Sequence, residues 1–101
     1  DVTTVPTQAL YFLNDPFVHS QAEKFAARAL AAATDEQSRI NAAYQLLFGR
    51  QATVGEQQDA TTFFKEYAAA VADRPEAERP LLTWQAYARV LLSSSEVLHV
   101  D

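Results

Sequence analysis

His19 and Glu23 are the two side chains best spaced to share a metal ion. They stand four residues apart in a segment with helical periodicity, so both lie on one face of a helix. A protein metal site usually needs three or four ligands, and the other histidine, His99, lies near the opposite end of the chain. We therefore expect a solvated pair at this position, and we predict neither a metal site nor a cofactor.

Ser93, His99 and Asp101 have the residue types of a nucleophilic triad. Such a triad works where a strained turn exposes the serine and nearby backbone N–H groups form an oxyanion hole. This segment contains no glycine that could build such a loop, and nothing in the sequence makes the three groups converge. We predict that the domain by itself is not an enzyme and has no catalytic residue.

Two pairs of carboxylates have local structural explanations. Asp35 and Glu36 fall in the first turn of a predicted helix, where the helix dipole favours negative charge. Glu76 and Glu78 fall within residues 73–80, a charged stretch containing two prolines that we expect to be a linker. Neither pair therefore predicts acid–base catalysis.

Residues 49–56 form the most informative cluster in the sequence. Gly49 ends one predicted helix, and Thr53 begins the next with a capping-box pattern that is completed by Glu56. Arg50 belongs to neither signal, and its guanidinium can form a forked pair with a carboxylate. We expect Arg50 to bind Glu56 or Glu96, the latter of which would tie this connection to the C-terminal segment. The alternative is an exposed arginine that binds an anionic partner.

The charge balance excludes whole classes of partner. The net charge is −5, and the eight lysines and arginines are spread thinly along the chain. Binding to nucleic acid normally needs clustered basic residues that neutralise phosphates, and the same argument weakens a role at an anionic membrane surface.

The apolar runs fall far short of the ~20 residues that a membrane-spanning helix needs. With no cysteine in the chain, disulfides are excluded as well.

Caps, breaks and apolar periodicity predict five helical segments. They cover residues 6–13, 16–33, 34–49, 53–72 and 81–94, and the third begins with a capping box at Thr34. In the second segment the predicted inward face consists of Phe17, Ala22, Phe25, Ala26, Ala29, Leu30 and Ala33, and in the third of Ile40, Ala43, Tyr44 and Leu47. In the fourth it consists of Ala60, Phe63, Phe64, Tyr67, Ala68 and Val71, and in the fifth of Trp84, Tyr87, Ala88, Leu91 and Leu92. Residues 97–100 are expected to form an extended tail or a short last turn.

These segments predict an all-α fold. A chain of 101 residues, of which 49% are hydrophobic and only two are glycine, has the composition of one helical domain spanning residues 1–101. Short connections favour antiparallel neighbours, so we expect a compact up-and-down bundle of about four to five helices. Because the chain begins at Asp1, we expect it to be an internal or C-terminal piece of a larger protein.

Several strings in the sequence carry a family resemblance. They are TVPTQAL at residues 4–10, LNDPFV at 13–18, the GR…T..E turn at 49–56 and LLSSSEV at 91–97, followed by the closing VD. Together they resemble the C-terminal part of a planctomycete, cytochrome-associated domain family of unknown function, the PSD type. This chain has SSSEV at residues 93–97, where the family more often has NSNEF, and it lacks the Cys-x-x-Cys-His motif that attaches haem.

The resemblance implies that the parent is a large exported protein, in which this domain follows another uncharacterised domain and often a cytochrome-c-like module. We therefore expect a non-catalytic helical interaction or scaffolding module, whose partners are other domains of the parent chain or other proteins. If missing upstream residues normally complete the domain, exposed apolar surface could also support a homodimer. The alternative is an accessory part of a redox or polysaccharide-degrading enzyme whose active site lies mainly upstream.

Overall fold

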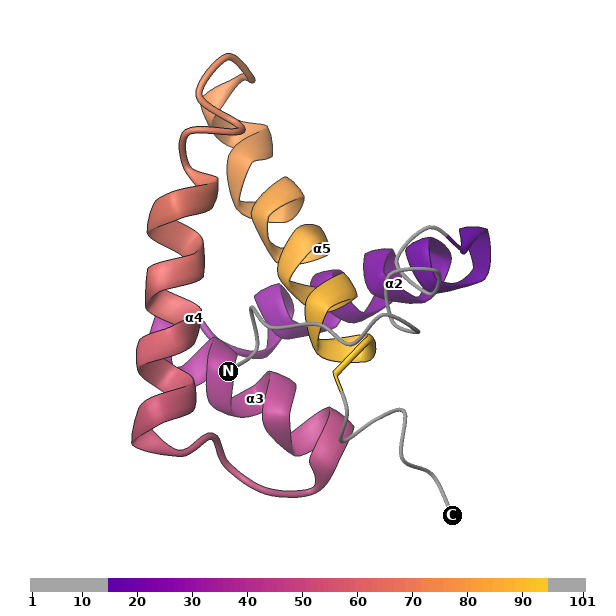
Figure 1. Ribbon diagram of the computed structural model, residues 1–101, viewed down its shortest axis with the longest axis vertical. Helices are drawn as coiled ribbons and strands as arrows, with labels where there is room; N and C mark the ends of the chain where they lie inside the picture. The colour runs from indigo at the N-terminus through magenta and orange to yellow at the C-terminus, as the bar shows by residue number, and fades with distance from the viewer. Residues whose placement is uncertain (1–14, 95–101) are drawn as a thin grey trace.

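The computed structural model describes residues 15–94, which fold into an all-α bundle (Figure 1). The described part of the chain contains four α-helices, one short 3₁₀ helix and no strand. The elements are α2 (Pro16–Ala32), α3 (Glu36–Phe48), α4 (Val54–Tyr67), the 3₁₀ helix η1 (Glu76–Glu78) and α5 (Arg79–Leu92). The predicted fold class is therefore confirmed. The helix expected at residues 6–13 and the tail expected at 97–100 lie outside the described residues.

Three helix boundaries follow the local signals in the sequence. Asp15 caps α2 by accepting a 2.7 Å hydrogen bond from the backbone N–H of Phe17, and Pro16 occupies the first turn. Gly49 ends α3 in the left-handed conformation, with φ at 69°. Thr53 begins α4 with the predicted capping box, in which its side chain accepts from the N–H of Glu56 and the Glu56 carboxylate accepts from its N–H.

The capping box predicted at Thr34 is wrong by one residue. Asp35 is the N-cap of α3, and its carboxylate accepts a 2.9 Å hydrogen bond from the N–H of Ser38. An ionised carboxylate is a stronger acceptor than a hydroxyl and also interacts favourably with the helix dipole. The helix therefore begins where the carboxylate can reach the third N–H, and Thr34 is left outside it.

Residues 68–78, called here the hairpin turn, replace the last turn predicted for α4. The helix ends at Tyr67, and Val71 is buried within the turn. The Arg79 side chain holds this turn by donating from Nε to the carbonyl of Arg74 at 3.0 Å and from Nη2 to the carbonyl of Ala72 at 2.9 Å. Helix α5 consequently begins at Arg79, two residues before its predicted start.

Figure 1 shows how the helices are arranged: α4 and α5 lie side by side and run in opposite directions, while α2 lies across α5. Small side chains make the contact between α2 and α5 close, because Ala22, Ala26 and Ala29 of α2 and Ala88 of α5 are fully buried. Short connections led us to expect antiparallel neighbours among the second, third and fourth helices. The pair that runs antiparallel side by side in Figure 1 is α4 and α5, which the longer segment 68–78 joins.

The inward faces are as predicted at most positions, with two corrections. Phe17 was expected to point inward but is 67% exposed, and its neighbour Val18 occupies the buried position. Ala68 was expected on the buried stripe of α4 but is exposed, because the helix has already ended there. Both errors lie at helix ends, where the 3.6-residue period no longer fixes which side chains face the core.

An aromatic cluster joins α4 to α5. Phe64 packs against Trp84 with ring centroids 5.3 Å apart and against Tyr87 at 5.1 Å, and Phe63 lies 5.5 Å from Tyr87. Tilted and edge-to-face pairs of this kind add to the free energy gained by burying the rings. The cluster fixes α4 against the outer side of α5.

The two glycines of the chain should respond oppositely to alanine. Gly49→Ala forces a side chain into the left-handed region and should lower the free energy of unfolding by about 1 kcal/mol. Gly55 lies in the first turn of α4, and a Cβ there would make only an ordinary 3.9 Å contact with Thr53 Oγ1, so Gly55→Ala should raise this free energy by up to about 1 kcal/mol. Urea denaturation followed by circular dichroism measures both, and a neutral Gly49→Ala would contradict the assigned helix end.

Candidate interaction site

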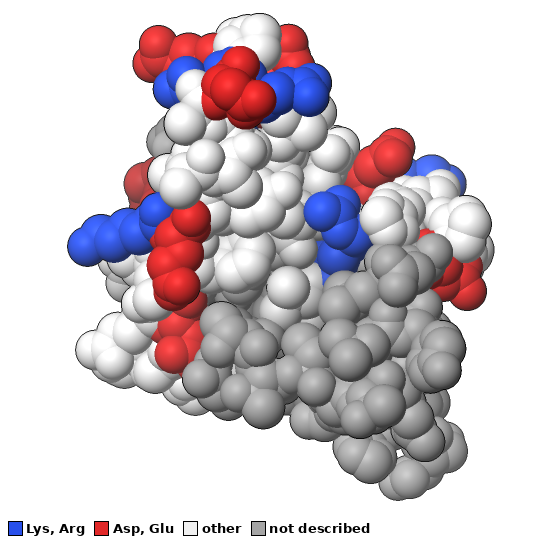
Figure 2. All heavy atoms as spheres, turned by 45° about the horizontal axis from the view of Figure 1, so that its top comes forward, with Lys and Arg blue, Asp and Glu red and all other residues white. Residues whose placement is uncertain are grey.

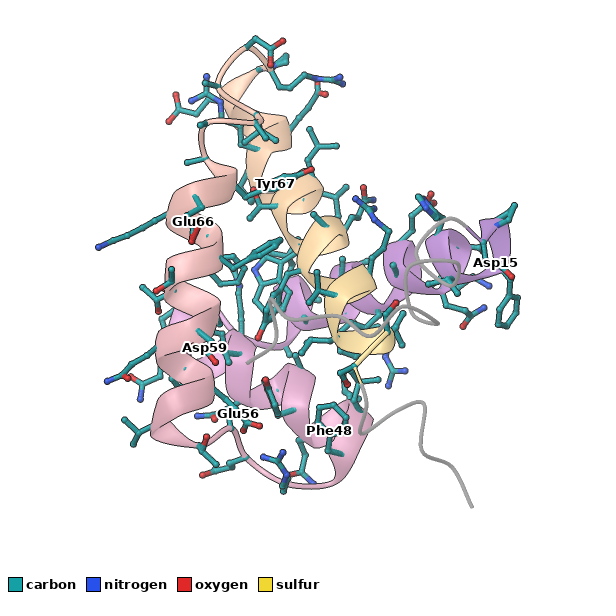
Figure 3. All side chains as sticks on the ribbon, in the orientation of Figure 1. Asp15, Phe48, Glu56, Asp59, Glu66 and Tyr67 are labelled. Atoms are coloured by element: carbon teal, nitrogen blue, oxygen red, sulfur yellow. The ribbon has the colours of Figure 1, made fainter. Side chains whose placement is uncertain are left out.

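Arg50 and Glu56 meet across the connection between α3 and α4. Their side chains form two parallel hydrogen bonds, Nη1 to Oε1 at 2.8 Å and Nη2 to Oε2 at 3.0 Å. The guanidinium also lies 5.4 Å from the ring centroids of Tyr44 and Phe48, the latter labelled with Glu56 in Figure 3. A forked ion pair together with cation–π contacts to two rings holds the arginine in one orientation.

Glu56 therefore serves two partners at once, since it also accepts the 2.8 Å capping bond from the N–H of Thr53. The hydrogen bonds from Arg50 are the main reason that the pKa of Glu56 lies below its ordinary value of 4.5, although partial burial works in the opposite direction. Of the two partners expected for Arg50, the structure shows Glu56, and Glu96 lies outside the described residues. The alternative role of Arg50, binding an anionic partner, stays a prediction.

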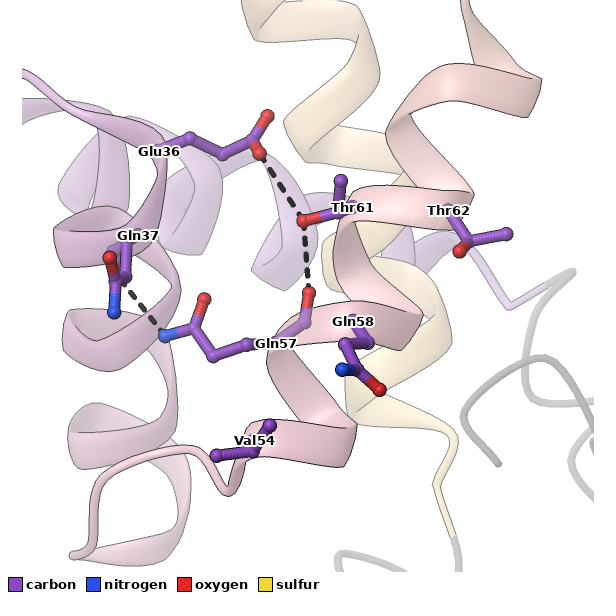
Figure 4. A pocket seen from close by; sticks show the side chains of 7 residues that line it. All are labelled: Glu36, Gln37, Val54, Gln57, Gln58, Thr61 and Thr62. Carbon is purple, nitrogen blue, oxygen red and sulfur yellow. Dashed lines mark hydrogen bonds between the residues drawn. The ribbon is translucent and has the colours of Figure 1, made fainter.

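A polar seam joins α3 to α4 beside this connection. Asn41 Oδ1 accepts hydrogen bonds from the Ala52 N–H and from Gln57 Nε2, both at 3.1 Å. Gln57 Nε2 also donates to the Gln37 carbonyl at 3.2 Å, and Thr61 Oγ1 donates to the Gln57 carbonyl at 3.0 Å (Figure 4). Asn41 and Gln57 were not among the predicted site residues, although polar side chains that repeat four residues apart, as Gln57 and Thr61 do, are a usable signal for such a seam.

The hollow over this seam has a volume of about 540 Å³ and is lined mainly by amide and hydroxyl side chains (Figure 4). Its lining residues are Glu36, Gln37, Val54, Gln57, Gln58, Thr61 and Thr62. Three of these side chains bond across the two helices: Gln57 donates to the Gln37 carbonyl, and Thr61 donates to Glu36. The hollow is therefore best explained as the outer side of a helix–helix contact.

A second hollow, called here the Trp84 groove, lies where α3, the end of α4 and the start of α5 meet. It has a volume of about 460 Å³. Its floor is apolar, formed by Phe64, Val71 and Trp84, of which the last two are nearly fully buried. Exposed Ala68 lies at its edge. A groove with an aromatic floor is suited to an apolar side chain of a binding partner.

Two arginines line the Trp84 groove, and both are held by backbone carbonyls. Arg39 donates from Nε to the carbonyl of Ala33 at 2.8 Å, and Arg79 bonds the hairpin turn as described above. Neither arginine forms an ion pair with a carboxylate within residues 15–94. Their remaining guanidinium N–H groups are thus oriented beforehand and keep the capacity to bind.

Two glutamates line the same groove, Glu36 on the wall of Arg39 and Glu76 on the wall of Arg79. Glu36 accepts a long hydrogen bond of 3.4 Å from Thr61. Glu76 is exposed and forms no ion pair within the described residues. Each wall of the groove therefore offers one positive and one negative group, three residues apart in sequence.

The structure does not bring the other candidate residues together into a site. His19 and Glu23 line a small hollow at the start of α2, and no group of three His, Cys, Asp or Glu that could hold a metal ion occurs among the described residues. Ser93 is fully buried, whereas His99 and Asp101 lie outside the described range. Glu78 forms a 3.2 Å ion pair with Arg74 on the hairpin turn.

Four side-chain hydroxyl groups are buried without a hydrogen-bond partner within residues 15–94: those of Tyr44, Tyr87, Ser93 and Ser94. Burial raises the pKa of both tyrosine hydroxyls. The two tyrosines lie close enough to influence each other's pKa, yet they form no hydrogen bond of good geometry. An unpaired hydroxyl in the core lowers stability.

Comparison with known proteins identifies the family of this chain. Residues 1–64 match PSD1, a family described as "Protein of unknown function (DUF1553)". The chain belongs to the PSD1 family. The match includes α2, α3 and most of α4, and thus the Arg50–Glu56 pair. No curated protein and no solved structure matches the chain. Among the described residues, no helix of this PSD1 protein combines the length and apolar character needed to cross a bilayer.

The Arg50–Glu56 pair should make stability depend on pH. Because the pKa of Glu56 is lowered on folding, its contribution is present above the unfolded value of about 4.5 and is lost as the pH falls through the folded value. Glu56→Gln should therefore cost roughly 0.5–1 kcal/mol at pH 7, and the difference from the unsubstituted protein should shrink toward pH 3. Urea titrations from pH 3 to pH 8 measure it.

Glu66→Gln is the matched control, since Glu66 is exposed on the same helix and forms no ion pair within the described residues. We expect that substitution to change the free energy of unfolding by less than about 0.5 kcal/mol at every pH. The lowered pKa of Asp35 affects all three proteins alike and so cancels in the differences. A pH-independent difference for Glu56→Gln would show that the ion pair contributes nothing.

The buried hydroxyl of Tyr87 should be dispensable. Tyr87→Phe keeps the ring contacts with Phe64 and Trp84 and removes a group that has no hydrogen-bond partner. We expect the free energy of unfolding to stay the same or to rise by up to about 1 kcal/mol. Thermal unfolding followed by circular dichroism measures this, and a loss of more than 1 kcal/mol would show that the hydroxyl is bonded in solution.

Proposed function

We propose that this chain is a non-catalytic helical interaction and scaffolding module of a larger exported protein. The Trp84 groove carries this proposal, because it joins an apolar aromatic floor to oriented charged groups on a rigid helical hairpin. Binding surfaces commonly combine a buried aromatic anchor with a polar rim. Membership of the PSD1 family is compatible with this role and adds no catalytic residue.

We further propose that the module lies near the C-terminus of a planctomycete parent and contacts either other domains of that parent or separate proteins. The resemblance of the terminal strings to the C-terminal part of the family supports this placement. A homodimer through exposed apolar surface is the other form that the interaction could take. The acidic net charge of −5 and the few basic residues disfavour nucleic acid as a partner.

A second candidate function is an accessory wall of an enzyme active site that is built mainly by upstream residues. One observation favours it: Trp84 lines a hollow that another domain could complete. However, His19 and Arg50 lie outside that hollow, so the groove does not gather the residues that an active-site wall would be expected to supply. The interaction module therefore remains the better supported function.

Deletion of this module from the full-length parent should alter assembly while the remaining domains stay folded. We expect a lower assembly mass in sedimentation, or a lower melting temperature of the neighbouring domain, since a scaffolding module acts through contacts with its neighbours. If deletion changed neither assembly nor stability, the proposal would fail. Loss of an enzymatic activity with unchanged assembly would instead favour the accessory role.

A further inference from the structure

The Trp84 groove has features that define the chemistry of what it binds, and the inference drawn from them rests on the proposed interaction function. Its floor is formed by Phe64 and Trp84, whose ring centroids lie 5.3 Å apart, together with Val71 of the hairpin turn. Both rings pack on the protein core, and the half-buried Phe64 ring keeps accessible surface, whereas Trp84 is 4% exposed. A floor of this kind favours an apolar side chain.

The arginines of the groove add a requirement for negative charge in the ligand. Nε of Arg39 and both Nε and Nη2 of Arg79 donate to backbone carbonyls, which fixes each guanidinium without neutralising it. Four N–H groups of Arg39 and three of Arg79 are not used in these bonds. Because both arginine side chains are already oriented, binding a carboxylate costs less side-chain conformational entropy.

The glutamates add a requirement for positive charge. Glu36 and Glu76 lie on the same walls as the two arginines, and neither is paired with an arginine or lysine within residues 15–94. A purely anionic ligand would meet these carboxylates, and a purely cationic ligand would meet the arginines. Figure 2 shows charged side chains of both signs gathered at the hairpin turn, which forms one side of the groove. The lining thus fits a ligand that carries both charges.

The open shape of the groove favours a peptide over a small metabolite. Small-molecule sites usually bury most of the ligand surface in a concave pocket, whereas this groove is open at the surface between helices. Helical grooves with apolar floors and charged rims are a recurring mode of peptide recognition, in which one or two apolar anchors enter the groove and charged neighbours contact its walls.

We propose that the Trp84 groove binds a short segment of a partner protein in which an apolar anchor residue is flanked by an acidic and a basic residue. The anchor packs on Phe64 and Trp84. The acidic neighbour binds Arg39 or Arg79, and the basic neighbour binds Glu76, since Glu36 already accepts a hydrogen bond from Thr61.

A displayed library of random 12-residue peptides, selected on the immobilised protein, tests this proposal. The probe is the most enriched peptide, and its binding is read from the emission of Trp84, the single tryptophan of the chain. We expect enriched sequences to share an apolar residue with acidic and basic neighbours. Lack of enrichment, or enriched sequences without charged neighbours, would overturn the proposal.

Substitution at the edge of the groove shows whether the peptide binds there. Ala68→Gln should weaken binding at least fivefold by filling the edge, and Ala69→Gln should change it less than twofold, because Ala69 is exposed next to it but does not line the groove. Both positions are exposed, so equal melting temperatures are expected and should be checked. Equal affinity of the two variants for the peptide would contradict the assigned site.

A coupling measurement tests the charged contacts. Glu76→Gln should weaken binding of the selected peptide about threefold or more, but should have no effect on a peptide whose basic residue is replaced by glutamine. The same loss for both peptides would overturn the predicted contact. If the groove variants bind normally while deletion of the module still disrupts the parent assembly, the peptide proposal fails and the interaction function stands. If peptides bind but assembly does not need the module, the interaction function fails.

Discussion

The close contact between α2 and α5 is the constraint on which the rest of the structure depends. Fully buried alanines on both helices allow their backbones to approach, and α2 lies across α5 as a result (Figure 1). With one side of α5 covered in this way, its Trp84 and Tyr87 rings pack against Phe63 and Phe64 of α4. The packing of α4 on α5 therefore sets the position of α4 and of the two hollows that α4 helps to line.

Arginines in this protein have two different physical roles. Arg50 forms an ion pair with the Glu56 carboxylate and lies over two aromatic rings, so its charge is compensated within the α3–α4 connection. Arg39 and Arg79 are held by backbone carbonyls, which orient a guanidinium, and neither forms an ion pair with a carboxylate within the described residues. A charged side chain that has no ion-pair partner and lies beside an apolar floor is typical of binding surfaces, whereas an ion pair within the fold mainly adds stability.

Local signals predicted most of the fold because each depends on a few neighbouring residues. The Asp15 cap before Pro16, the Gly49 helix end and the Thr53–Glu56 capping box each need only one turn of backbone, and all three are present. The same reasoning failed by one residue at Thr34, because Asp35 caps the helix instead by accepting from the N–H of Ser38. It also failed at Phe17 and Ala68, because periodicity does not determine burial at a helix end.

The candidate site was predictable only in part. The sequence by itself determined the all-α class, four helical segments and the pairing of Arg50 with a carboxylate, because helix caps, apolar periodicity and a capping box are local properties of the chain. Only the tertiary structure decided that Arg39 and Arg79 lie beside Phe64 and Trp84. These residues come from three helices. Their distance from one another depends on how closely α2 packs on α5 and on where the hairpin turn reverses the chain. The sequence of a single segment does not determine either.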